Sequence, residues 1–264
     1  MASKMRLDAL LAERGLFETR TRAAASVLAG EVRIGDHGAR ATKPGTLVAT
    51  DVTLSVDEVP RYVSRGGIKL ANALAASGVE VSGRKCLDIG ASTGGFTDCL
   101  LQSGAAAVVA LDVAYGELSW KLRSDPRVSV IERSNARELR PDSLPYAPEL
   151  IVADVSFISL RLLLGPLLSC AAPRFDALLM VKPQFEVGRG LVGRGGVVRD
   201  GELRRGAMLA VAAAAAELGA SVRGFFGSGL PGPKGNIETF VALAEGSRGS
   251  LADLPALARE ADGG

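Results

Sequence analysis

Four polar residues are placed where they could move a proton. Asp154 ends the apolar run Leu-Ile-Val-Ala-Asp, Lys182 ends Leu-Leu-Met-Val-Lys, Glu238 precedes Phe-Val-Ala-Leu, and Lys69 lies ahead of the first expected sheet strand. Catalytic side chains gather at the carboxyl ends of parallel strands, so we expect Asp154 and Lys182 to lie together. A lysine acts as a base near neutral pH only where nearby positive charge and desolvation favour its neutral form. The alternative is four unrelated surface salt bridges.

A glycine-rich turn is the sharpest motif of the chain. In Cys86-Leu-Asp-Ile-Gly-Ala-Ser-Thr-Gly-Gly-Phe a buried strand runs into glycines and then into the start of a helix. Glycine lets the backbone approach a ligand closely, and a helix N-terminus offers free N–H groups. The dinucleotide pattern G-x-G-x-x-G is absent. The turn resembles the first motif of class I S-adenosylmethionine methyltransferases; the alternative is a structural turn without a ligand. The resemblance implies cofactor contacts by Asp88, Gly90, Ala91, Ser92, Thr93, Gly94, Gly95 and Phe96.

Two further polar residues follow expected strands. Asp112 ends Ala-Val-Val-Ala-Leu-Asp, where a carboxylate can accept hydrogen bonds from both ribose hydroxyls of the cofactor, and Asn135 is placed to contact the adenine edge. Each has a simpler reading, since Asp112 could cap a helix and Asn135 could make a turn. Their spacing along a parallel sheet argues against nicotinamide chemistry.

Apolar strands alternate with helices from about residue 85 onward. Strands are expected at 86–89, 107–111, 128–131, 150–153 and 177–181, and the longest helix at about 203–218. This alternation predicts an α/β fold, a doubly wound, Rossmann-like class I methyltransferase sheet with helices on both faces. We expect a small N-terminal α+β domain over 1–58, a connection over 59–68 that contains Pro60, the methyltransferase domain over 69–246, and a tail over 247–264 that frays.

The first 50 residues are weakly basic, with eight Lys and Arg against five Asp and Glu. Leu7, Leu10 and Leu11 share one face of an expected helix, Thr21 is the expected cap of a second helix, and short strands follow. The order of Arg-Leu-Asp, Thr-Arg-x-x-Ala, Gly-x-Val-x-Ile and Lys-Pro-Gly resembles the ribosomal-protein-S-four-type RNA-binding domain over about residues 5–56. The resemblance implies RNA contact; an ordinary solvated face is the alternative for each candidate. The candidates are Arg6, Arg14, Arg20, Arg22 and Lys43.

Longer motifs are similar to the TlyA family over roughly residues 5–245. They are Tyr-Val-Ser-Arg-Gly-Gly-x-Lys-Leu, Ala-Ser-Thr-Gly-Gly-Phe-Thr, Asp-Val-Ser-Phe-Ile-Ser and Val-Lys-Pro-Gln-Phe-Glu-Val-Gly. Tyr62 departs from the family pattern, which often has tryptophan there. The resemblance implies S-adenosylmethionine-dependent methylation of a cytidine ribose 2′-hydroxyl in ribosomal RNA.

The same resemblance points to a set of catalytic residues, and the chemistry of their side chains suggests a role for each. Lys69, Asp154, Lys182 and Glu238 match the Lys-Asp-Lys-Glu tetrad of ribose 2′-O-methyltransferases. Lys182 is the expected base, Lys69 orients the hydroxyl, Asp154 faces the sulfonium, and Glu238 holds a lysine or the ribose. Arg65 is an expected RNA contact. Phe157 either stacks on a flipped-out base or the cofactor, or is a core aromatic.

Several function classes are excluded or kept as rivals. The start of the chain lacks a signal-peptide apolar stretch, and no apolar run has membrane length, so we expect a cytoplasmic protein. The three cysteines lack metal-ligand spacing, so no metal is expected. The only histidine, His37, lies in an expected polar loop of the first domain, which argues against imidazole catalysis. The rivals are a non-catalytic rRNA-binding or assembly protein, a pseudouridine synthase and a haemolysin-like membrane-active protein. The chain lacks the Gly-Arg-Leu-Asp-type motif that carries the catalytic aspartate of a pseudouridine synthase. Binding of S-adenosylmethionine distinguishes all three from a methyltransferase, and the oligomeric state stays open.

Overall fold

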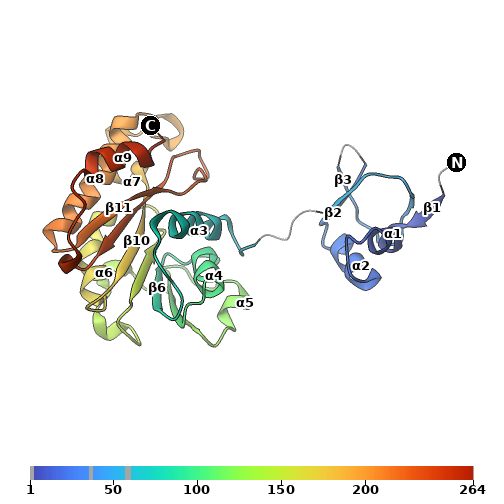
Figure 1. Ribbon diagram of the computed structural model, residues 1–264, viewed down its shortest axis with the longest axis horizontal. Coiled ribbons are helices and arrows are strands. Elements are labelled where there is room, and N and C mark those ends of the chain that lie inside the picture. The colour runs from blue at the N-terminus through green and yellow to red at the C-terminus, as the bar shows by residue number, and fades with distance from the viewer. Residues whose placement is uncertain (1–2, 36–37, 57–60, 264) are drawn as a thin grey trace. The chain divides into compact units, whose positions relative to one another are not determined.

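The computed structural model describes residues 3–35, 38–56 and 61–263, with the side chain of residue 189 left out. The chain forms two compact units, Met1–Pro60 and Arg61–Gly264 (Figure 1). His37 and the first part of the expected connection, residues 57–60, lie outside the described residues.

The first unit packs two helices against short antiparallel strands. The helices are α1 (Leu7–Glu13) and α2 (Arg20–Leu28), and the strands are β1 (Lys4–Arg6), β2 (Val32–Ile34), β3 (Ala39–Arg40), β4 (Leu47–Ala49) and β5 (Leu54–Val56). β1 pairs with β4, and the other three form a sheet in the order β3-β2-β5. Leu7, Leu10 and Leu11 are buried, as their helical spacing predicts. Thr19, rather than the expected Thr21, caps α2, because the helix begins one residue after it and its hydroxyl accepts from Arg22 N.

The second unit is built on a seven-stranded sheet in the order β11-β12-β10-β9-β6-β7-β8. The strands are β6 (Lys85–Ile89), β7 (Ala107–Leu111), β8 (Val128–Ile131), β9 (Leu150–Ala153), β10 (Asp176–Val181), β11 (Ser221–Gly227) and β12 (Thr239–Ala244). All pairs are parallel except those made by β12, which runs antiparallel to both β10 and β11. The predicted α/β, Rossmann-like fold class is confirmed, and the antiparallel edge adds to it.

Helices cover both faces of this sheet, in three layers (Figure 1). They are α3 (Arg65–Ser77), α4 (Gly95–Gln102), α5 (Trp120–Arg123), α6 (Leu164–Cys170), α7 (Pro183–Glu186), α8 (Gly201–Glu217) and α9 (Leu254–Ala261). Short 3-10 helices cover Ala136–Glu138, Pro141–Ser143, Leu160–Leu162, Arg189–Leu191, Arg194–Gly196 and Gly246–Arg248.

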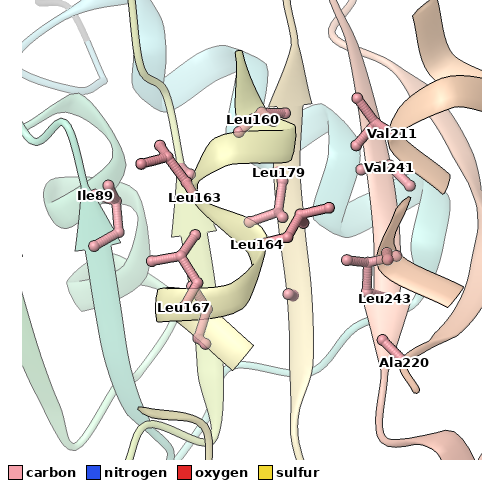
Figure 2. Packing of buried hydrophobic residues seen from close by; sticks show 14 of the residues in the cluster. Ile89, Leu160, Leu163, Leu164, Leu167, Leu179, Val211, Ala220, Val241 and Leu243 are labelled. Atoms are coloured by element: carbon pink, nitrogen blue, oxygen red, sulfur yellow. The ribbon is translucent and has the colours of Figure 1, made fainter. Parts of the chain in front are cut away.

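Alternate residues of each strand enter two separate cores. Cys86 packs with α3, α4 and α5 on one face, whereas Leu87 and Ile89 pack with α6, α8 and α9 on the other. Figure 2 shows part of the second core, where Leu164 of α6 lies beside the strand residue Leu179. The period of two that strands impose on side-chain direction explains this division. Both cores hold the strand ends rigidly, which fixes the positions of the residues that follow them.

Two boundaries differ from the sequence expectation. The expected connection over 59–68 overlaps α3, which begins at Arg65 because the Ser64 hydroxyl accepts from Gly66 N at 3.3 Å. The expected fraying tail contains α9, which buries Ala258 against the sheet core. Asp262, just past α9, is buried in ion pairs with two arginines of α8, at 2.5 Å and 3.2 Å. These tertiary contacts hold a segment that composition alone marks as polar and small.

Candidate active site

The glycine turn joins β6 to α4 at the carboxyl edge of the sheet. Gly90 has φ +78°, and a Cβ atom there would lie 2.6 Å from the backbone oxygen of Asp154. Gly94 has φ +98°, but its Cβ would meet Leu122 Cδ1 at 2.2 Å and Leu118 Cδ1 at 2.8 Å. Both positions therefore require glycine. The reasons differ: Gly90 lets two strand ends approach, and Gly94 lets the turn pack on apolar side chains.

A cavity of about 380 Å³, called here the turn cavity, opens beside this turn. Asp112 and Asn135 both line it, as the sequence predicts. Asp112 does not cap a helix: its carboxylate accepts from the backbone N–H groups of Ser92 at 2.7 Å and Ala114 at 2.8 Å, neither of which begins a helix. Asn135 caps a 3-10 helix through Arg137 N at 3.1 Å. Glu117, which carries no sequence signal, also lines the cavity and accepts from the Ser92 hydroxyl at 3.2 Å.

Asp88 lies beneath the turn and lines neither this cavity nor the one described next. Its side chain is fully buried, and the Thr97 hydroxyl donates to its Oδ2 at 2.6 Å. Burial raises the pKa of Asp88 to about 7, against the opposing hydrogen bond from Thr97. In this structure Asp88 therefore ties β6 to the first turn of α4, and its predicted contact with the cofactor stays a prediction.

A second cavity of about 450 Å³, the lysine cavity, brings together the four residues of the predicted tetrad. Lys69, Asp154, Lys182 and Glu238 all line it, from α3, the end of β9, the end of β10 and the segment before β12. Most of the glycine turn lines it as well: Gly90, Ala91, Ser92, Thr93, Gly95 and Phe96. It shares four wall residues with the turn cavity: Gly90, Ser92, Asp154 and Ser156. The two cavities are therefore adjacent.

The tetrad is divided into two ion pairs. Lys182 Nζ lies 2.6 Å from Asp154 Oδ1 and donates to the Ser156 hydroxyl at 2.9 Å. Lys69 donates to Glu238 Oε2, and both side chains are almost fully buried. The alternative of unrelated surface salt bridges is excluded, because the four side chains line one cavity. Ser156 is a site residue that the sequence analysis missed, although it lies in the motif Asp-Val-Ser-Phe.

Arg65 and Phe157 lie at the rims of these cavities. Arg65 lines the lysine cavity and donates to the Pro231 carbonyl at 2.8 Å, which holds the segment between β11 and β12. Phe157 lines the turn cavity and is 92% exposed, so it is not a core aromatic. Its φ of +65° is unfavourable for a bulky side chain, and its ring lies 5.4 Å from that of Phe185. An exposed aromatic held in this way is available to stack on a base.

The basic residues of the first unit fall into different settings. Arg6 and Arg20 both pair with the buried carboxylate of Asp8, at 2.8 Å and 3.1 Å. The Arg6 hydrogen bond is the main reason that the pKa of Asp8 is lowered to about 2. Arg14 donates to two backbone carbonyls of residues 50 and 52, which ties α1 to the segment between β4 and β5. Arg22 and Lys43 are exposed.

Comparisons with known proteins agree with this geometry. The FtsJ-like methyltransferase family model matches residues 62–245. The 16S/23S rRNA (cytidine-2′-O)-methyltransferase TlyA of Mycobacterium tuberculosis is 52% identical over 92% of this chain and 91% of its own. The chain belongs to the TlyA family of FtsJ-like methyltransferases.

Other members of the family carry different names. Hemolysin A of Brachyspira hyodysenteriae is 40% identical over 70% of this chain and 77% of its own. A solved structure of a hemolysin candidate from Streptococcus thermophilus is 40% identical, covers 100% of this chain and 96% of its own, and has a TM-score of 0.75. In the described ranges of this chain, no helix combines the length and apolar character that a bilayer crossing requires.

The family makes this chain an S-adenosylmethionine-dependent methyltransferase. The residues of the turn cavity fit that cofactor. Asp112, Glu117 and Asp154 line the cavity, and carboxylates suit ribose hydroxyl groups and a sulfonium cation. Gly90 lines the same cavity without a side chain, as the contact of its backbone with the Asp154 carbonyl requires.

Proposed function

We propose that this chain transfers a methyl group from S-adenosylmethionine to a ribose 2′-hydroxyl of ribosomal RNA, with cytidine as the target nucleoside. The observation that carries the proposal is the lysine cavity, where Lys69, Asp154, Lys182 and Glu238 line one space that shares a wall with the turn cavity. The name of the Mycobacterium tuberculosis relative supports the choice of rRNA and cytidine. An rRNA substrate would place the protein in the cytoplasm, where ribosomes are assembled.

The two cavities suggest which residues bind the cofactor and which act on the hydroxyl. When bound, S-adenosylmethionine supplies an activated methyl group, so the chain has mainly to align the hydroxyl and remove its proton. Asp112, Asn135 and the glycine turn would hold the cofactor. Lys182, positioned by Asp154 and Ser156, would accept the proton from the hydroxyl once the cationic sulfonium of the bound cofactor attracts the Asp154 carboxylate in its place, for a rate gain of about 10²–10⁴.

Lys69 and Glu238 act as a pair in this scheme. The carboxylate of Glu238 neutralises the Lys69 charge, so the repulsion of Lys182 by Lys69 that the sequence suggested is weakened. Lys69 then serves mainly to orient the hydroxyl, and Glu238 holds Lys69. Asp154, shared by both cavities, would face the methyl donor.

RNA recognition would be divided between the two units. Arg22 and Lys43, which are exposed, would offer positive charge to phosphates, and Arg6 and Arg20 would add the charge that their shared partner Asp8 leaves unneutralised. The Arg14 guanidinium is occupied by backbone carbonyls. Phe157 would stack on the base of the target nucleotide, and Arg65 would contact the RNA beside it.

Mapping of 2′-O-methyl groups tests this function. Ribosomal RNA from a strain that lacks the gene is incubated with the purified full chain and isotope-labelled S-adenosylmethionine, and the label is located by nuclease digestion and mass spectrometry. The proposal expects label on the ribose of one or a few cytidines. Label on a base, on a non-cytidine ribose only, or nowhere in rRNA would contradict it.

A further inference from the structure

Glu186, at the end of α7, is buried against a segment that follows a different strand. Its side chain is 1% exposed. One carboxylate oxygen accepts from the Ser159 hydroxyl at 2.6 Å and the other accepts from Leu160 N at 2.7 Å. Arg161 Nε lies 3.4 Å from the same carboxylate and supplies the opposite charge. A buried carboxylate with three donors is well compensated, and all three donors come from residues 159–161.

The 154–161 segment begins with residues of the active site. Asp154 and Ser156 both contact Lys182 Nζ, at 2.6 Å and 2.9 Å. Phe157, in the middle, packs on Phe185 with ring centroids 5.4 Å apart. The 154–161 segment therefore meets the Lys182–Glu186 segment at its start, its middle and its end. Glu186 makes the contacts at the end.

The two segments leave neighbouring strands of the sheet. β9 and β10 are parallel and paired, with Ala153 opposite Leu179. Only a few residues after these strands, Lys182 and the 154–161 segment must meet with the correct spacing. The 154–161 segment is also strained, because Phe157 has φ +65°. Such a conformation persists only where contacts on both sides hold it.

We infer that Glu186 is a positioning residue for methyl transfer: its buried carboxylate holds the 154–161 segment in place against Lys182. The inference rests on the proposed function, and on the contacts of Lys182, Ser159 and Leu160. Without Glu186 the end of the segment is released, Phe157 relaxes, and Ser156 and Asp154 lose their fixed distance to Lys182. The chemical step slows because a small misplacement of the reacting groups is costly.

Three variants separate positioning from general stability. Glu186→Ala removes every contact, Glu186→Gln keeps the shape and one acceptor but removes the charge, and Ser159→Ala removes one donor. Glu217→Gln, at an exposed position on α8, is the matched control. Single-turnover methyl transfer is measured with saturating cofactor and rRNA, well below the melting temperature. Amide hydrogen exchange of residues 155–161 is measured on the same full-length proteins.

We expect Glu186→Ala to slow transfer at least about tenfold, and Glu186→Gln and Ser159→Ala to slow it less. Residues 155–161 should exchange faster in Glu186→Ala, and a Glu186→Ala/Ser159→Ala double variant should be no slower than Glu186→Ala alone, since both changes remove the same hydrogen bond. Control rates should match the wild type.

A purely structural role for Glu186 would lower the melting temperature while leaving the rate per folded molecule and the exchange of 155–161 unchanged, and this result would overturn the inference. If Glu186→Ala does not fold, the other two variants decide by the same criteria. A wild type that leaves rRNA unmethylated would refute the proposed function, whereas hydrogen exchange would still decide whether Glu186 holds the 154–161 segment.

Discussion

The ammonium group of Lys182 lies 2.6 Å from the carboxylate of Asp154, where the lysine cavity meets the turn cavity. Each residue ends a neighbouring parallel strand, so the sheet brings them together although they are 28 positions apart in the sequence. Ser156 completes the arrangement as a second acceptor for the ammonium group. The Lys182 side chain is thereby held beside the wall that the lysine cavity and the turn cavity share.

Replacement of Lys182 tests its role as the base. Lys182→Ala should lose methyl transfer by at least about a hundredfold while it keeps its affinity for cofactor and RNA. Lys182→Arg should rescue little, because a guanidinium keeps its proton near neutral pH. Single-turnover rates and calorimetric cofactor affinity measure both effects, with the exposed Lys85→Ala as the control. An arginine variant with a near-normal rate would contradict this role and leave Lys69 as the candidate base.

Removal of one partner from the Lys69–Glu238 pair should destabilise the second unit. Both side chains are buried, at 8% and 1% exposure, so Glu238→Ala leaves an unpaired charge that costs about 3–5 kcal/mol. The double variant Lys69→Met/Glu238→Leu should recover most of that stability and remain inactive. Urea unfolding measures the stabilities, and Glu217→Ala should change them by less than about 0.5 kcal/mol. A double variant that is as unstable as Glu238→Ala would contradict this account.

Gly94→Ala should act through folding rather than through the cofactor. The turn motif alone suggests that a side chain here would crowd the ligand, but the added Cβ would meet Leu118 and Leu122 instead. We expect a loss of about 1–3 kcal/mol beyond the loss in Gly219→Ala, which has a similar φ but no atom within 4 Å. Urea unfolding of both variants measures the difference. Equal losses in the two variants would show that Leu118 and Leu122 yield freely.

The titration of Asp88 should make the folded protein less stable as the pH rises. Its folded pKa of about 7 lies above that of an unfolded aspartate, so the folded state holds a proton that the unfolded chain releases between about pH 4 and pH 7. The stabilisation is complete below pH 4 and is lost as the pH rises through 7, on the order of 4 kcal/mol. Asp88→Asn should flatten this slope in urea unfolding at pH 5 and pH 8. The exposed Asp142→Asn is the control, and an unchanged slope in Asp88→Asn would place the titration elsewhere.

The first unit should bind RNA through phosphates. Replacement of Arg20, Arg22 and Lys43 by glutamine should weaken rRNA binding and reduce the slope of log affinity against log salt by about two to three. Cofactor affinity should stay the same, and Arg259→Gln on α9 should leave the salt slope unchanged. Filter binding at several salt concentrations measures the slopes. A triple variant with the wild-type slope would assign this unit another role.

Much of the fold and part of the site follow from local sequence signals. Alternating apolar runs place β6 to β10, and polar residues that end those runs, such as Asp112 and Asp154, must lie at one edge of the sheet. The turn at Gly90 can be predicted from the sequence, because glycines that follow a buried strand and precede a helix are typical of a ligand-binding turn. These predictions hold in the folded protein because they depend on backbone geometry within a few residues.

Other features were decided only by tertiary structure. Lys69 meets Glu238 across 169 positions, and Glu186 meets Ser159 across 27. Three more features depend on which distant segments lie nearby. They are the atoms that a Cβ at Gly94 would meet, the exposed left-handed conformation of Phe157 and the packing of α9. The physical reason is that local propensity sets where an element begins and ends, whereas the partner of a side chain depends on the packing of elements that are remote in the sequence.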